Sequence, residues 1–204
     1  MTEDRSRASA VRETFRPPAT DLPPWLPVRR PNRLDLDGYR EPGRFFVTAS
    51  TSGRQPWFRR DAVARYCADA LRESCSRQRF ELVAYCFIPD HLHFLVESEQ
   101  EGTDLVRLVR DFKQRTGWWF RNRYQAGGLK ASPTGFRPSL WQRSYYDHVL
   151  GQDDDSDRIV RYILDNPVDA CLVEDAFDYP YSWCAYDWPE RILASNMPAG
   201  LGHD

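Results

Sequence analysis

The chain has 204 residues and a formal net charge of −2, with 28 Lys and Arg side chains against 30 Asp and Glu. This near-balance excludes an overall polycation that coats nucleic acid, although a local basic patch remains compatible with it. Hydrophobic residues make up 41% of the chain and aromatic residues 14%, which excludes a wholly disordered protein and predicts a packed core.

The sequence also predicts the cellular location of the protein. No run approaches 18 consecutive apolar residues, so we expect no membrane span, and residues 1–30 lack the apolar segment of a secretory signal. The cysteines are odd in number, widely spaced and without a Cys-x-x-Cys pair: Cys67, Cys75, Cys86, Cys171 and Cys184. This spacing predicts reduced, mostly buried thiols in a cytoplasmic protein.

Proline density divides the chain. Seven prolines fall within residues 1–42, where they prevent helix continuation and cannot donate to a sheet ladder. We therefore expect an extended Pro-rich arm over 1–42, one folded domain over 43–190 and a flexible tail over 191–204.

The first predicted elements are a strand over 44–50, rich in aromatic and β-branched residues, and a helix over 61–78 with apolar residues at offsets of three and four. A strand over 80–88 follows, apolar on both faces and therefore covered on both sides. Strict alternation places Phe80, Leu82, Ala84, Cys86 and Ile88 on one face and Val83, Tyr85 and Phe87 on the other.

A turn at Pro89-Asp90 leads into a strand over 91–97, which completes a hairpin. A helix over 104–123 and an extended segment over 140–150 come next. The acidic run Asp153-Asp154-Asp155 suits the start of a helix over 156–165, which Pro167 is expected to end.

This order of elements predicts the fold class. Strand, helix, strand, strand, helix and strand match an α+β, ferredoxin-like β-α-β-β-α-β antiparallel sheet. The extra C-terminal helix over 156–165, which carries Tyr162, can then cover the sheet face that the other two helices leave open.

Two histidines form the first candidate site. His91 and His93 lie two residues apart on a strand, so they project from the same face, while Leu92 and Phe94 project into the helical layer. Two imidazoles at this spacing can ligate one metal ion or can form a hydrogen-bonded structural pair. Polar rings in so apolar a hairpin need partners in either case.

The last predicted helix supplies the second candidate site. Tyr162 and Asn166 are four residues apart, on one side of the helix and at the border of its apolar face. If the helix covers the open sheet face, both approach His91 and His93. Asn166 then adds an oxygen ligand and Tyr162 lies beside the metal as nucleophile; the alternatives are an ordinary packing aromatic and a helix-end asparagine.

The third feature is a basic stretch. Residues 104–143 hold nine basic and two acidic residues, a local charge of +7, whereas residues 147–187 carry −9. Tryptophans and tyrosines alternate with the basic residues, which is typical of a phosphate track with stacking platforms and equally of a solvated helix over core aromatics. The candidate DNA-binding residues are Arg107, Arg110, Lys113, Arg115, Arg121, Arg123 and Arg143.

Four linked motifs resemble a known family. They are Tyr85-Cys-Phe-Ile-Pro-Asp-His-Leu-His93, Trp141-Gln-Arg-Ser-Tyr-Tyr-Asp-His148, the Tyr-x-x-x-Asn-Pro-Val sequence that begins at Tyr162, and Tyr179-Pro-Tyr-Ser-Trp183. In this order and spacing, over about residues 44–186, the chain resembles the REP-associated tyrosine transposases of the single-tyrosine HUH superfamily.

The resemblance implies a ferredoxin-like fold and a transposase that acts on single-stranded or hairpin DNA. It implies His91, His93 and Asn166 as ligands of Mg²⁺ or Mn²⁺ and Tyr162 as the nucleophile that forms a 5′-phosphotyrosine link. Relatives act as monomers or as homodimers, and both states remain open here.

Two other functions remain open from the sequence. A non-catalytic DNA-hairpin binder of the same fold agrees with the overall acidity and with Asp169, which stands where the family commonly has arginine. A metal hydrolase or nucleotide-handling enzyme is the third reading, although Leu95 occupies the place of a third alternating histidine; His148 is a residue that such a site could recruit.

Overall fold

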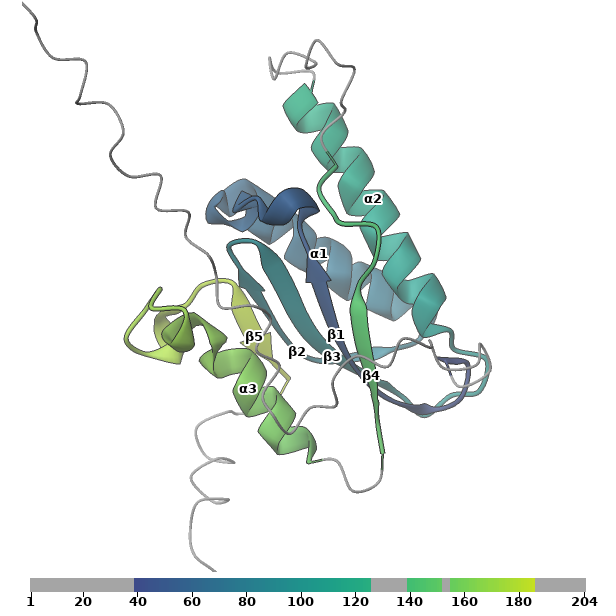
Figure 1. Ribbon diagram of the computed structural model, residues 1–204. Coiled ribbons are helices and arrows are strands. Elements are labelled where there is room, and N and C mark those ends of the chain that lie inside the picture. Colours follow the sequence, from purple (N-terminus) through teal and green to yellow (C-terminus); the bar gives the residue numbers. More distant parts are fainter. Residues whose placement is uncertain (1–38, 126–138, 152–154, 186–204) are drawn as a thin grey trace, which may run out of the picture. The chain divides into compact units, whose positions relative to one another are not determined.

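The computed structural model describes residues 39–125, 139–151 and 155–185 (Figure 1). The predicted tail over 191–204 and nearly all of the predicted arm over 1–42 lie outside these residues. Tyr39, close to the end of that arm, is buried and belongs to the hydrophobic core. The bounds of these three predicted regions therefore stay predictions.

An antiparallel sheet of five strands organises the described residues, in the order β4-β1-β3-β2-β5. The order of the first four strands is that of a ferredoxin-like unit, so the predicted α+β fold is confirmed. The strands are β1 (Gly43–Ser50), β2 (Glu81–Ile88), β3 (His91–Ser98), β4 (Tyr146–Leu150) and β5 (Ser182–Cys184).

Helices cover both faces of this sheet (Figure 1). Helices α1 (Asp61–Gln78) and α2 (Leu105–Gln125) pack against each other and share a core with Leu92 and Phe94 of β3. Helix α3 (Ser156–Asp169) packs on the other face, against β2, β3 and β5. Short 3-10 turns lie at η2 (Ser52–Arg54), η3 (Trp57–Arg59) and η4 (Ala176–Asp178).

A β-bulge corrects the predicted faces of β2. The pairing register of β2 with β3 shifts between Leu82 and Ala84. The shift places Phe80 and Leu82 with Tyr85 and Phe87 in the core under α1 and α2, so they do not share a face with Cys86 and Ile88. Simple alternation was wrong there because one extra residue in a strand reverses the faces of everything on one side of it.

The extended segment predicted over 140–150 contains a shorter strand than expected. Only Tyr146–Leu150 pairs as β4, and Trp141 forms an isolated bridge with Thr51. Between them, the carbonyl groups of residues 142–144 accept hydrogen bonds from the Lys113 ammonium group. These carbonyls are held by a side chain of α2 instead of a neighbouring strand.

Helix α3 begins as predicted but ends later. Asp155 caps it by accepting hydrogen bonds from the backbone N–H groups of Asp157 and Arg158, while Asp153 and Asp154 lie outside the described residues. Pro167 was expected to end the helix, yet the helix continues to Asp169. Pro167 lies in the last turn, so the hydrogen bond that its missing N–H removes affects only the end of the helix.

Among the described residues, no helix combines the length and the apolar character that crossing a membrane requires. Three of the five cysteines, Cys67, Cys75 and Cys86, are buried as thiols. Burial raises the pKa of the Cys75 thiol to about 12.

Candidate active site

Strand pairing places a row of polar side chains on the sheet face that α3 covers. Thr48 of β1 lies opposite His93 of β3 on one side and opposite Tyr146 of β4 on the other. His93 in turn lies opposite Cys86, which lies opposite Ser182. Directly paired residues of antiparallel strands share a face, so the five side chains form one row.

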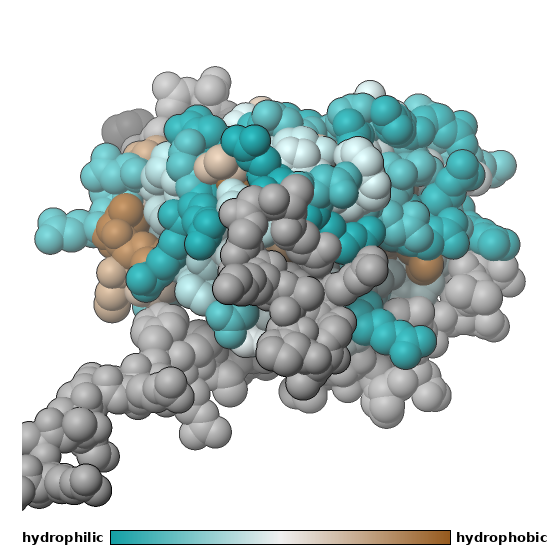
Figure 2. All heavy atoms as spheres, turned by 90° about the horizontal axis from the view of Figure 1, so that it is seen from above, coloured by the Kyte–Doolittle hydropathy of each residue, from teal (hydrophilic) through white to brown (hydrophobic). Residues whose placement is uncertain are grey.

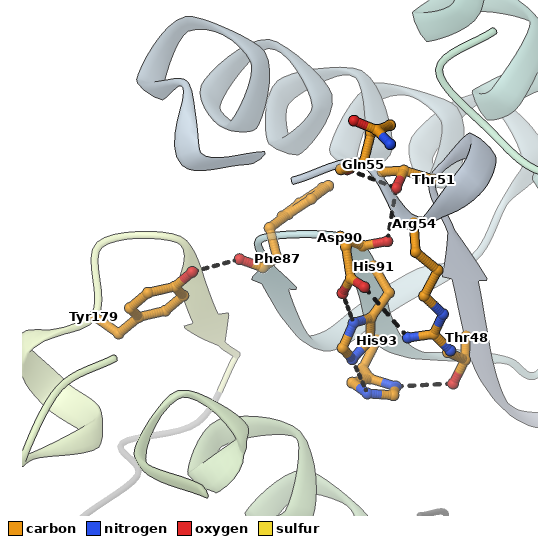
Figure 3. A network of polar contacts seen from close by, with 9 residues as sticks. All are labelled: Thr48, Thr51, Arg54, Gln55, Phe87, Asp90, His91, His93 and Tyr179. Atoms are coloured by element: carbon orange, nitrogen blue, oxygen red, sulfur yellow. Dashed lines mark hydrogen bonds and ion pairs between the residues drawn. The ribbon is translucent and has the colours of Figure 1, made fainter. Parts of the chain in front are cut away.

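The two histidine rings converge at the start of β3 (Figure 3). Their Nε2 atoms lie 3.0 Å apart. The Nδ1 atom of His91 lies 2.6 Å from the Asp90 carboxylate, and the Nδ1 atom of His93 lies 2.8 Å from the Thr48 hydroxyl. Because each Nδ1 has a partner, both Nε2 lone pairs can face the space between the rings.

Asp90 is fixed from two sides. Its side chain is buried, accepts from His91 and forms a 3.4 Å ion pair with Arg54. Burial opposes ionisation, but the hydrogen bond from His91, with the charges of His91 and Arg54, holds the pKa of Asp90 below its ordinary value. An ionised carboxylate orients the His91 ring and keeps the proton on Nδ1.

His93 is almost fully buried, and this burial, together with the charges of His91 and Arg54, lowers its pKa well below the ordinary value. Its ring is therefore neutral, as a metal ligand must be. The fit to an ion is also geometric, since neighbouring ligands of an octahedral ion with bonds of about 2.1 Å lie about 3.0 Å apart, the separation of the two Nε2 atoms.

A third protein ligand would have to come from outside the His, Cys, Asp and Glu side chains. Among the described residues, no group of three or more His, Cys, Asp and Glu side chains has the geometry to hold a metal ion. Asn166 is a candidate for this role, because its side chain lies near enough to His93 to raise the pKa of that ring, against the larger effect of burial. Its Nδ2 atom donates to the Tyr162 carbonyl oxygen at 2.6 Å, which leaves the amide oxygen to face the histidines.

Helix α3 also brings Tyr162 to the histidines. The ring of Tyr162 lies edge-on to that of His93, with centroids 5.4 Å apart, and edge-on to Phe46 at 6.0 Å. Phe46 also stacks on His93, at 5.6 Å, so the three rings contact one another. The structure thus unites His91, His93, Tyr162 and Asn166 in one cluster.

Two further phenols, those of Tyr145 and Tyr146, compete with Tyr162 for the role of nucleophile, and the structure places them apart. Tyr146 lies in the polar row, with its ring 6.3 Å from that of Phe46, and burial together with the charge of Asp147 raises its pKa. Tyr145 lies on the α2 side, 5.7 Å from the Lys113 ammonium group. His148 pairs with Phe46 and therefore shares the α3 face.

The seven candidate DNA-binding residues differ in their partners and in their exposure. Lys113 holds the backbone of residues 142–144, and Arg115 forms an ion pair with Glu73. The other five side chains are exposed: Arg107, Arg110, Arg121, Arg123 and Arg143.

Sequence reasoning missed three residues of the cluster. Thr48 carried a weak signal, as the polar member of an otherwise apolar strand. Asp90 carried one through its place next to His91. Arg54 carried none, since it reaches Asp90 only because the chain turns at residues 53–54, both with positive φ.

The chain is similar in sequence and in fold to several known proteins. The sequence model of the family described as "Transposase IS200 like" matches residues 45–166, more than half of the chain. A protein of Haemophilus influenzae, provisionally named a REP-associated tyrosine transposase, is 27% identical over 150 residues, which cover 69% of this chain and 78% of that protein.

A REP-associated tyrosine transposase of Escherichia coli K12 is 26% identical over 103 residues, half of this chain and 53% of that protein. The solved structure of a REP-associated tyrosine transposase bound to a REP hairpin superposes with a TM-score of 0.56 and 22% identity. That alignment covers 87% of this chain and 93% of the other, and it shows a shared fold. By its sequence match and its fold, the chain belongs to the IS200-like transposase family.

Proposed function

We propose that this transposase-family chain cleaves and rejoins single-stranded DNA next to hairpins, with Tyr162 as the nucleophile. The observation that carries the proposal is the contact between the Tyr162 ring and His93, at a centroid separation of 5.4 Å. A phenol beside paired imidazoles joins a nucleophile to a site for a divalent ion on one protein surface.

Tyr162 supplies the attacking atom of the proposed reaction. The Tyr162 oxygen attacks the phosphorus atom, the bond from phosphorus to the 3′ oxygen breaks, and a 5′-phosphotyrosine forms. The phenol loses its proton, and the leaving 3′ oxygen gains one to become a hydroxyl. Reversal of the same exchange, with a different 3′-hydroxyl, rejoins strands, so no external energy source is needed.

His91, His93 and Asn166 would hold Mg²⁺ or Mn²⁺. Such an ion would polarise a phosphate oxygen and offset the charge that develops on it. The protein groups behind the ligands determine their orientation: Asp90 and Arg54 fix the His91 ring, and Thr48 fixes that of His93. Nitrogen ligands suit Mn²⁺ better than Mg²⁺, which prefers oxygen.

The test is covalent capture of DNA. The full chain is incubated with a single-stranded hairpin oligonucleotide and Mn²⁺, and the adduct is measured on a denaturing gel. Tyr162→Phe should abolish the adduct and leave binding nearly intact. The matched control is Tyr146→Phe, which removes the same atom from the same sheet face and should retain capture.

Undiminished capture by Tyr162→Phe would refute the assignment and move the nucleophile to Tyr146. Hairpin binding without an adduct in either Mg²⁺ or Mn²⁺ would favour the non-catalytic binder. Release of phosphate from a nucleotide, with no adduct, would favour a hydrolase.

A further inference from the structure

A basic groove lies on the α2 side of the molecule, away from the histidine site. It has a volume of about 950 Å³ and runs between α2 and the segment 139–145. Among the described residues that line it, the only acid is Asp111. The cations of its lining are Arg77, Arg110, Lys113, Arg115, Arg121 and Arg143. This charge favours an anionic partner.

A single row of α2 residues forms one wall. Arg110, Gln114, Trp118 and Arg121 follow one another at helical spacings of four, four and three, and all four line the groove. From Arg110 to Arg121 the helix rises roughly 16 Å at 1.5 Å per residue.

Trp118 is 63% exposed, the largest exposed fraction of any large hydrophobic side chain among the described residues. An indole placed between arginines, with so little burial, contributes little to the core. A flat ring flanked by cations is suited to stack on an unpaired base whose phosphates the cations contact.

Gly117 leaves room beside this ring. A Cβ atom built at Gly117 would meet nothing within 4 Å, so packing does not require a glycine there. A glycine inside a helix is unfavourable relative to alanine, and Gly117 also lines the groove. The open space lets a ligand approach the helix backbone next to Trp118.

The surface of the molecule is largely polar on the face drawn in Figure 2. Hydrophilic residues dominate that face, seen from above, and apolar residues form only small, separate areas there.

The wall opposite α2 connects the groove to the histidine site. Gln142 N–H donates to the Ser50 carbonyl oxygen at 2.9 Å, and Ser50 lies opposite His91 in the sheet. Trp141 bridges to Thr51, whose N–H donates to the Asp90 carbonyl oxygen at 2.9 Å. The wall opposite α2 is therefore hydrogen-bonded to the end of β1, whose Ser50 pairs with His91.

We propose that this groove binds a single-stranded DNA segment that continues into the cleavage site, a role that rests on the proposed function. Trp118 stacks on one base, and Arg110, Arg121 and Arg143 contact phosphates. Lys113 and Arg115 support the groove through their intramolecular partners. The contacts are to bases as flat surfaces and to phosphates, so this segment binds with little sequence preference.

The test measures binding of a fluorescein-labelled 12-nucleotide single strand of mixed sequence to the full chain, by anisotropy. Trp118→Ala should weaken binding by roughly 5- to 150-fold, the usual effect of losing one stacked base. Trp118→Phe should restore most of it. The control is Phe177→Ala, which removes the other large exposed hydrophobic side chain and should change nothing.

Charge is tested in the same assay by varying salt. Arg121→Gln should reduce the slope of log affinity against log salt by about 0.7, the value for one phosphate contact on a single strand. Arg65→Gln, an exposed arginine of α1 paired with Asp61, should leave the slope unchanged.

Wild-type affinity in Trp118→Ala would overturn the groove assignment, and an equal loss on a 12-base-pair duplex would overturn the choice of single strands. The proposed function fails separately. Trp118-dependent binding without any Tyr162 adduct would leave the groove intact and refute cleavage. A normal adduct yield, with binding that does not depend on Trp118, would support cleavage and refute the groove.

Discussion

The two faces of the sheet differ in what the same strand supplies to them. On the α1 and α2 side, β3 contributes Leu92 and Phe94 to a core of apolar residues. On the α3 side, the same strand contributes His91 and His93, flanked by Thr48 and Asp90. One face is built for packing, and the other combines packing with a partnered polar cluster.

The difference teaches how a cluster of polar side chains is held inside a core. Buried polar groups are costly unless each has a partner. Here each histidine Nδ1 atom has one, while Phe46 and Ile163 continue the apolar packing around the cluster. The face that α1 and α2 cover then supplies the rigidity that keeps the cluster in place.

The largest effect is expected on stability, from Phe94→Ala on the face that α1 and α2 cover. Phe94 is fully buried, so its truncation leaves a cavity and should lower the free energy of unfolding by about 3–5 kcal/mol. Guanidinium denaturation with intrinsic fluorescence measures this. Below the unfolding transition the variant should still capture DNA; a cost under about 1 kcal/mol would mean that this face is not the main source of stability.

A smaller effect is expected from Asp90→Asn on the face that α3 covers. The variant keeps the shape of the side chain but removes the charge that orients His91, so Mn²⁺ affinity should fall about 10- to 100-fold. Isothermal titration with Mn²⁺ measures it, and Asp69→Asn, an exposed member of an α1 ion pair, is the control. Unchanged Mn²⁺ affinity in Asp90→Asn would show that Asp90 stabilises the turn and does not orient His91 for metal binding.

The smallest effect concerns pH. Burial lowers the pKa of His93 well below its ordinary value of about 6.5, so below pH 6.5 the unfolded chain takes up a proton that the folded chain does not. The free energy of unfolding should therefore decrease as pH falls, by about 1.4 kcal/mol per pH unit for one proton. This loss continues until the pH reaches the lowered pKa of the folded state.

Urea denaturation in EDTA at pH 7.5, 6.5 and 5.5 measures this dependence. His93→Gln should show a shallower decrease, because its side chain does not titrate. Equal slopes in the two proteins would contradict a neutral, buried His93.

Much of the site was predictable from local patterns. Period-two alternation placed His91 and His93 on one face, and helical spacing placed Tyr162 and Asn166 together, because each pattern repeats within a few residues. The role of Asp90 behind His91 was less visible, since a turn and a positioning carboxylate look alike in sequence.

By itself the sequence determined the order of the elements, the apolar faces and the pair of candidate motifs, all of which depend on short-range periodicity. Only the tertiary structure decided the bulge after Leu82, the late end of α3 at Asp169, and the meeting of Tyr162 with His93. Tertiary packing also separated the exposed arginines from Lys113 and Arg115, whose partners lie far along the chain. These outcomes depend on contacts between distant segments, and a one-residue change of register or a single hydrogen bond is enough to alter them.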